Sequence, residues 1–137
     1  MAAATAGSAE HPLHVLVVED SKMLAERICE LLRQLPYVNE IDTVDTEEAA
    51  RGVMAHEQVD VMILDLHLRQ GNGFGVLRAL SNATHRPYVV VLTNYDLPQY
   101  KEAALALGAT YFMDKIRDYD RLSDAIRELH ARTLRRA

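Results

Sequence analysis

Five polar side chains in this sequence could together bind a divalent cation and transfer a phosphoryl group. They are Glu19, Asp20, Asp65, Thr93 and Lys115. Three acids brought together repel one another and favour a hard cation. A few protein oxygens at an open site suit Mg²⁺, which keeps several waters and shares a substrate phosphate. A hydroxyl and a lysine beside that cation can bind the other phosphoryl oxygens, so the set predicts phosphoryl chemistry.

Asp65 is the predicted nucleophile of this set. No serine, cysteine or histidine is better placed, and a carboxylate that attacks phosphorus forms an acyl phosphate. Mg²⁺ held by Glu19, Asp20 and Asp65 would neutralise charge on the transferring group. Lys115 and Thr93 would bind its remaining oxygens. Considered alone, Asp65 is explained about equally well as a cap or turn residue at the end of a strand.

The elements that must position these residues alternate between strand and helix. The apolar run at residues 61–64, directly before Asp65, is typical of a strand covered on both faces, as in the centre of a parallel sheet. Other apolar runs, helical spacing, caps and stops predict the remaining elements. Strands are expected at residues 13–18, 37–44, 59–64, 88–92 and 110–113, and helices at 22–35, 46–56, 74–80, 96–107 and 118–134.

The second strand differs from the others because Asn39, Glu40 and Asp42 interrupt its apolar pattern, and we place it at the edge of the sheet. The alternating series predicts an α/β fold with a doubly wound, five-stranded parallel sheet and helices on both faces. At this size the expected strand order is 2-1-3-4-5. Strands one and three are then neighbours, so their carboxyl ends bring Glu19 and Asp65 together.

Taken in order, these motifs closely resemble the receiver domain of two-component response regulators. The matching residues are Glu19-Asp20, Asp65 after Met62-Ile63-Leu64, Gly73 eight residues beyond Asp65, Thr93 after Val89-Val90-Val91-Leu92, and Gly108-Ala109 followed by Phe112 and Lys115. The resemblance covers about residues 13–134 and implies a flavodoxin-like (βα)5 fold. We expect a flexible tail at residues 1–11, a receiver domain at residues 12–135 and no output domain, as in a stand-alone receiver.

The resemblance implies that a histidine kinase or histidine phosphotransfer protein passes a phosphoryl group to Asp65. The Mg²⁺ ligands that it implies are Glu19, Asp20, Asp65 and the backbone carbonyl of His67. Such a domain assists its own phosphorylation and slow dephosphorylation, but it is a phosphoacceptor and not an enzyme.

The resemblance also implies a switch. In the family, the threonine hydroxyl turns toward the phosphoryl group and an aromatic residue on the fifth strand turns inward; those positions are Thr93 and Phe112 here. Plain core packing is the alternative explanation of Phe112, with odds of about one in three. The usual output face combines the fourth helix, fifth strand and fifth helix, roughly residues 97–134, and we expect it to contact a target protein or form a homodimer.

The sequence departs from the family pattern next to its matching residues. Ile116 stands where the family commonly has proline after a cis bond, so the loop after Lys115 is expected to take another path. Arg69 also replaces a usual proline. The other departures are His67, Asn94 and Tyr95, at or beside positions that tune hydrolysis in the family. Their bulk is predicted to shield the acyl phosphate and lengthen its lifetime.

Composition excludes several other classes. The 137 residues fit one domain, and a net charge of −5 disfavours a nucleic-acid or anionic-membrane surface. Cys29 is the only cysteine, which excludes an intramolecular disulfide and a cysteine-rich zinc site. The six histidines show no metal-ligand spacing, and His14 is interpreted as a packed or edge histidine. Without a secretory signal or a long apolar run, the protein should be soluble and cytoplasmic.

Three other functions stay open. A pseudo-receiver would be an interaction module independent of phosphorylation; the intact acidic site opposes it, while Ile116 and Asn94 leave it room. A phosphatase with Asp65 as nucleophile wants a second acid two residues later, where His67 stands. A flavin carrier of similar fold is disfavoured because the acidic site would repel a cofactor phosphate.

Overall fold

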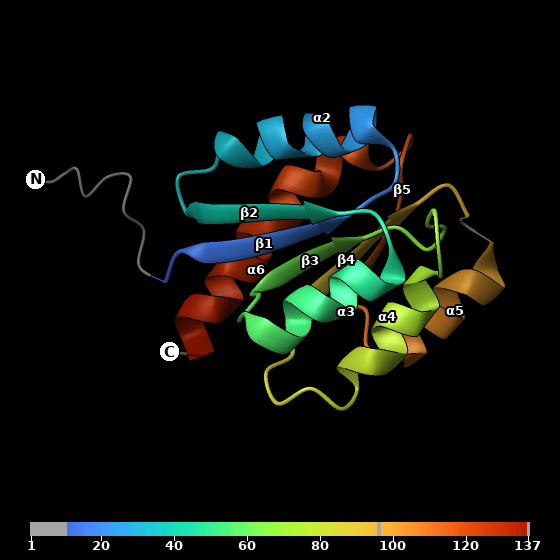
Figure 1. The fold of residues 1–137 in the computed structure, drawn as a ribbon. Helices are drawn as coiled ribbons and strands as arrows, with labels where there is room; N and C mark the ends of the chain where they lie inside the picture. The colour runs from blue at the N-terminus through green and yellow to red at the C-terminus, as the bar shows by residue number, and fades with distance from the viewer. Residues whose placement is uncertain (1–10, 96, 137) are drawn as a thin grey trace, which may run out of the picture.

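The five strands form one parallel sheet in the order β2-β1-β3-β4-β5, as predicted (Figure 1). The structure, a computed structural model, describes residues 11–95 and 97–136. The strands are β1 (Leu13–Val18), β2 (Val38–Val44), β3 (Val61–Leu64), β4 (Tyr88–Thr93) and β5 (Tyr111–Asp114). The helices are α2 (Lys22–Arg33), α3 (Glu47–His56), α4 (Gly73–Leu80), α5 (Pro98–Ala106) and α6 (Leu122–Arg136), with a 3₁₀ turn η1 (Tyr119–Arg121) before α6. Apart from His11, the expected tail at residues 1–11 lies outside the described residues.

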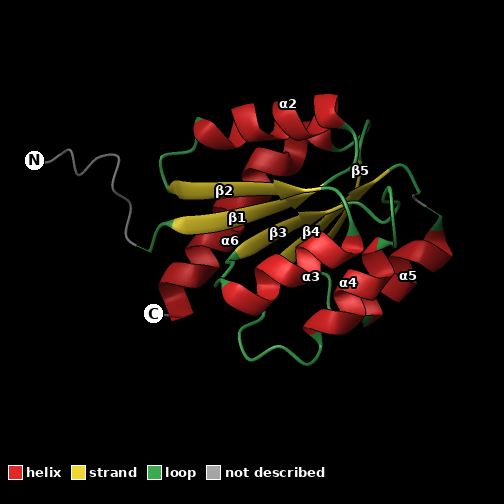
Figure 2. Cartoon of the chain, viewed as in Figure 1, coloured by secondary structure: helices red, strands yellow, loops and turns green. Residues whose placement is uncertain are grey.

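Helices cover both faces of the sheet (Figure 2). Side chains of α3, α4 and α5 pack with Leu16 and Val18 of β1, whereas those of α2 and α6 pack with Val15 and Val17. Every residue of β1 and β3 is buried, because neighbouring strands flank both and helices cover both faces. This is why β3 reads as a continuous apolar run and β1 as an apolar run interrupted only by His14.

Local signals define most helix ends. Ser21, Thr46 and Asn72 cap α2, α3 and α4, each accepting a backbone N–H from the residue three positions later. Pro98 is the first residue of α5, and the predicted start at Asp96 lies outside the described residues. Gly108, with φ of 103°, adopts the left-handed conformation that commonly follows a helix. No helix of the described residues is long and apolar enough to cross a membrane.

Two predicted helix boundaries were wrong. The first helix ends at Arg33, not at Leu35, because a residue that precedes proline is disfavoured in the helical conformation and Pro36 follows. The last helix does not begin at Asp118. The N–H of Arg121 bonds to the carbonyl of Asp118, which makes a tighter 3₁₀ turn before α6.

Candidate functional site

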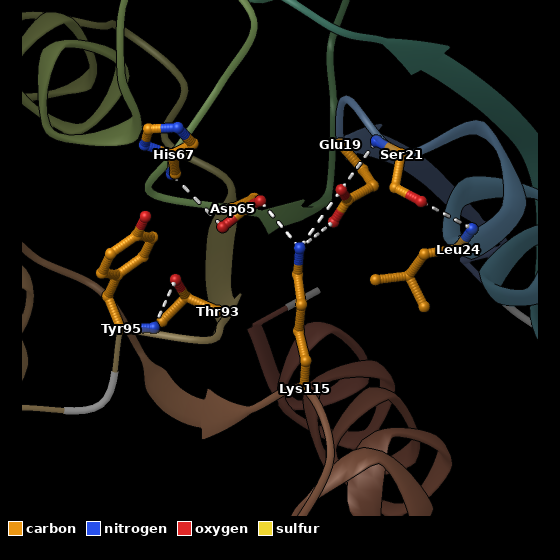
Figure 3. Close-up of polar contacts among 8 residues, drawn as sticks. All are labelled: Glu19, Ser21, Leu24, Asp65, His67, Thr93, Tyr95 and Lys115. Carbon is orange, nitrogen blue, oxygen red and sulfur yellow. Dashed lines mark hydrogen bonds and ion pairs between the residues drawn. The ribbon is translucent and has the colours of Figure 1, made fainter.

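The carboxyl ends of four adjacent strands bring the predicted site residues to one edge of the sheet. Glu19 and Asp20 follow β1, and Asp65 follows β3. Thr93 is the last residue of β4, and Lys115 follows β5. Figure 3 shows the side chains of all of these residues except Asp20.

Lys115 joins the two buried acids of the site. Its Nζ atom lies 2.8 Å from Oδ2 of Asp65 and 2.9 Å from Oε1 of Glu19 (Figure 3). Asp65 is only 4% exposed and Glu19 only 5%. Burial alone would lower the pKa of Lys115, but its hydrogen bonds to Asp65 and Glu19 outweigh burial and hold that pKa above its ordinary value. The lysine is therefore a fixed positive charge between two acids.

The three carboxylates suit a hard cation. Oxygens of Glu19, Asp20 and Asp65 all lie within 4.8 Å of one another. Burial raises the pKa of Glu19, although the N–H of Ser21, 2.9 Å away, and Lys115 both oppose that rise. The backbone N–H of His67 donates to Oδ1 of Asp65 at 3.3 Å. A role for the carbonyl of His67 as a ligand stays a prediction.

Thr93 is fully buried at the floor of the site. Its Oγ1 accepts the backbone N–H of Tyr95 at 3.2 Å, which leaves its own hydrogen able to donate. The ring of Tyr95 lies 5.4 Å from that of His67 and 6.1 Å from that of Tyr100. Asn94 is exposed. Two of the three residues predicted to tune hydrolysis therefore contact each other beside the site.

Residues 114–118 form a turn that uses the backbone N–H of Ile116. The N–H groups of Ile116 and Arg117 both donate to Oδ1 of Asp114 at 2.8 Å, and proline at position 116 would lack this donor. No peptide bond of the described residues is cis, and Ile116 is 86% exposed. Phe112, on β5, is partly buried against the core under α3, α4 and α5. Its position is compatible with packing and with a switch.

Sequence reasoning missed the residues that hold the turn after Asp65. Arg69 forms two hydrogen bonds with Asp45, of 3.1 and 3.3 Å, which join the loop after β3 to the loop after β2. Glu47 accepts the backbone N–H of Asn72 at 3.1 Å. These pairs span 24 and 25 residues, so no local spacing could have indicated them.

Gly73 was noted only as a family match, but it lies against the backbone that carries Asp65. A Cβ atom on Gly73 would stand 2.5 Å from the carbonyl oxygen of Asp65 and 2.8 Å from the Cα of Leu66. Real Cβ atoms do not approach so closely, so this position requires glycine. The turn after β3 is therefore packed onto the end of the strand.

Comparisons with known proteins agree with this geometry. A family model described as the response regulator receiver domain matches residues 15–127. The sensory transduction protein LytT of Enterococcus faecalis is 29% identical over 114 residues, which cover 83% of this chain and 46% of that protein. The photosynthetic apparatus regulatory protein RegA of Rhodobacter capsulatus is 27% identical over 112 residues, covering 82% and 60%. The chain thus spans about half the length of such curated relatives.

Solved structures show the same fold. A signal receiver domain from Vibrio parahaemolyticus superposes with a TM-score of 0.81 at 26% identity, covering 88% of this chain and 92% of that one. The receiver domain of a Francisella response regulator gives a TM-score of 0.75 at 25% identity, covering 88% and 98%.

Proposed function

Because the chain belongs to the family of response regulator receiver domains, as the match over residues 15–127 shows, we propose that Asp65 is its phosphoacceptor. The donor is a phosphohistidine of a histidine kinase or phosphotransfer protein. A carboxylate oxygen of Asp65 forms the new bond to phosphorus. The bond from phosphorus to the donor's imidazole nitrogen breaks, and its electron pair stays on that nitrogen. The product is an acyl phosphate on Asp65.

The observation that carries the proposal is the bridge from Lys115 to Asp65 and Glu19. Lys115, whose side chain is 12% exposed and lies 2.8 Å from the carboxylate, is placed to move to an oxygen of the incoming phosphoryl group. Glu19 can retain its hydrogen bond from Ser21 while Lys115 shifts. The site thus contains in advance the positive charge that the product needs.

Mg²⁺ fits the same acids. Glu19, Asp20 and Asp65 would hold it through oxygen atoms, which is the ligand type that it prefers. When bound, it neutralises charge on the phosphoryl oxygens. The exposure of Asp20 keeps one side of the group open to solvent, as a partly hydrated cation requires.

Thr93 offers a route from phosphorylation to a change of surface. Its hydroxyl now accepts the N–H of Tyr95, so a turn of Thr93 toward the phosphoryl group would break the link to the loop after β4. We propose that this loop and Phe112 then rearrange the face formed by α5, β5 and α6. That face would bind a target protein or a second copy of the chain.

The aromatic pair of His67 and Tyr95 supports a long-lived acyl phosphate. Its two rings lie 5.4 Å apart beside the site and, with Asn94, restrict the approach of water. Replacing either ring by alanine should speed loss of the phosphoryl group, measured as the decay of the phosphorylated mass. A half-life of seconds in the wild type would contradict this shielding.

The test of the proposed function is labelling with acetyl phosphate, followed by intact mass. We expect one phosphoryl group per chain in the wild type, dependent on Mg²⁺, and none in Asp65→Asn. Asp120→Asn removes the same charge from an exposed position and should label normally. Labelling that persists in Asp65→Asn would refute the assignment. Failure of the wild type to take up either phosphate or beryllofluoride would favour a pseudo-receiver.

A further inference from the structure

A second group of ligating side chains lies at the opposite, amino end of the sheet. Nε2 of His14, on β1, lies 2.7 Å from an oxygen of Asp42, 3.7 Å from one of Glu40 and 3.8 Å from one of Glu57. The register of β1 with β2 pairs His14 with Glu40, and alternation puts Asp42 on the same face. Glu57 is the C-cap of α3. The four donor atoms lie within 4.8 Å of one another.

A hydrogen bond at Nδ1, the ring nitrogen that faces away from the acids, fixes the orientation of the His14 ring. Nδ1 lies 3.0 Å from the carbonyl oxygen of Gln58, and because a carbonyl only accepts, Nδ1 carries the hydrogen. A neutral ring then presents the lone pair of Nε2 to the carboxylate of Asp42. Two acceptors at 2.7 Å repel unless a cation joins them, and His14 is only 8% exposed. The arrangement therefore calls for a positive charge at Nε2.

The surrounding charge exceeds what one proton neutralises. No lysine or arginine of the described part of the chain forms an ion pair with Glu40, Asp42 or Glu57. Glu57 also lies at the carboxyl end of α3, where the helix dipole favours a cation. The group as a whole favours a divalent charge.

We infer that these four side chains form a binding site for a divalent transition metal, best fitted by Zn²⁺. An imidazole with carboxylates suits zinc, whereas Mg²⁺ and Ca²⁺ prefer oxygen alone. Tetrahedral Zn²⁺ with bonds of about 2.0–2.2 Å sets its donors about 3.3–3.6 Å apart. Nε2 lies closer than this to the oxygen of Asp42 and slightly farther than this from those of Glu40 and Glu57. The three carboxylates are about half-exposed, so their side chains can move to the tetrahedral separation. A backbone carbonyl behind the ring is also how metal-binding histidines are held.

The site shares no residue with the acidic group around Asp65. Its test is zinc binding, measured by calorimetry and native mass spectrometry in excess Mg²⁺, which occupies the acids at the carboxyl end. The wild type should bind one Zn²⁺ at this site. Loss of a group that only hydrogen-bonds to a metal ligand typically weakens metal binding by about 10–100-fold. Glu57→Gln and His14→Gln each remove a ligand itself, so each should weaken zinc binding at least that much. Zinc should also raise the unfolding temperature of the wild type more than that of Glu57→Gln.

Two control variants locate the ion. Glu48→Gln removes the same charge from an exposed position of α3 and should bind zinc like the wild type, as should Asp65→Asn. Loss of zinc binding in Asp65→Asn would place the ion at the carboxyl end and overturn the inference. Equal affinity in the wild type and Glu57→Gln, or no zinc bound by the wild type, would also overturn it. Glu57→Gln keeps the test valid should His14→Gln fail to fold, because Glu57 lies outside the core.

Discussion

The two ends of the sheet each gather acids around one side chain that can carry a positive charge, but they do so in opposite ways. At the carboxyl end the centre is Lys115, and the two acids that it joins are at most 5% exposed. At the amino end the centre is His14, and the side chains of its acids are 40–54% exposed. The cluster at the carboxyl end therefore has a permanent positive charge on Lys115. The cluster at the amino end takes its positive charge from solution, as a proton or another cation on His14.

The largest expected effect is a loss of stability when Lys115 is replaced by an uncharged residue. Lys115→Met leaves Asp65 and Glu19 buried without their counter-charge, and breaking such a pair typically costs about 3–5 kcal/mol. The free energy of unfolding in Mg²⁺-free buffer, from urea titration, measures this cost. Mg²⁺ should recover part of it, because the cation replaces the missing charge.

A surface lysine provides the matched control. Lys101→Met, at an exposed position of α5, should change the free energy of unfolding by less than about 0.5 kcal/mol. If Lys115→Met were equally mild, with or without Mg²⁺, the acids at the carboxyl end would be screened by solvent like those around His14. The comparison between the two ends would then be wrong.

Two glycine substitutions test how tightly each end is packed. Gly73→Ala pushes a methyl group against the backbone of Asp65 and should destabilise the protein by about 1–3 kcal/mol, the usual cost of overpacking. Gly52→Ala, in the α3 helix that leads to the amino-end cluster, meets nothing within 4 Å and should stabilise by about 0.5–1 kcal/mol. Thermal unfolding of both variants checks the signs; a stabilising Gly73→Ala would show that the turn yields.

The carboxyl end could be read from the sequence because each of its residues follows an apolar run. Once Asp65 and Thr93 are taken as strand ends, parallel topology alone brings them to one edge. The contacts of Arg69 and Ile116 could not be read in this way. Their partners are Asp45, in another loop, and Asp114, whose side chain had no predicted role. Such contacts depend on loop paths, which spacing does not encode.

The amino end escaped prediction for a different reason. Glu40 and Asp42 were taken as interruptions that mark an edge strand, which is correct, and His14 as a packed or edge histidine. Only the register of β1 with β2 shows that these residues share a face. Spacing along the sequence cannot reveal such a group, because its side chains come from β1, β2 and the end of α3.

The smallest expected effect is the pH dependence that His14 contributes at the amino end. In EDTA, the raised pKa of His14 means that the folded state binds this proton more tightly than the unfolded state, whose value is near 6.5. The stabilisation is therefore complete below about pH 6.5 and is lost as pH rises through the folded pKa. The groups that face the ring are the carboxylates of Glu40, Asp42 and Glu57 and the carbonyl of Gln58, while Asp60 accepts the backbone N–H of His14.

Urea unfolding of the wild type and His14→Gln across this pH range isolates the effect. The wild type should lose stability relative to His14→Gln as pH rises, whereas His56→Gln, an exposed histidine at the end of α3, should follow the wild type. Zinc should reverse the slope, because a metal binds the deprotonated ring and gains affinity as pH rises. A difference between wild type and His14→Gln that does not vary with pH would mean that His14 only packs, and that the carboxyl end alone depends on charge.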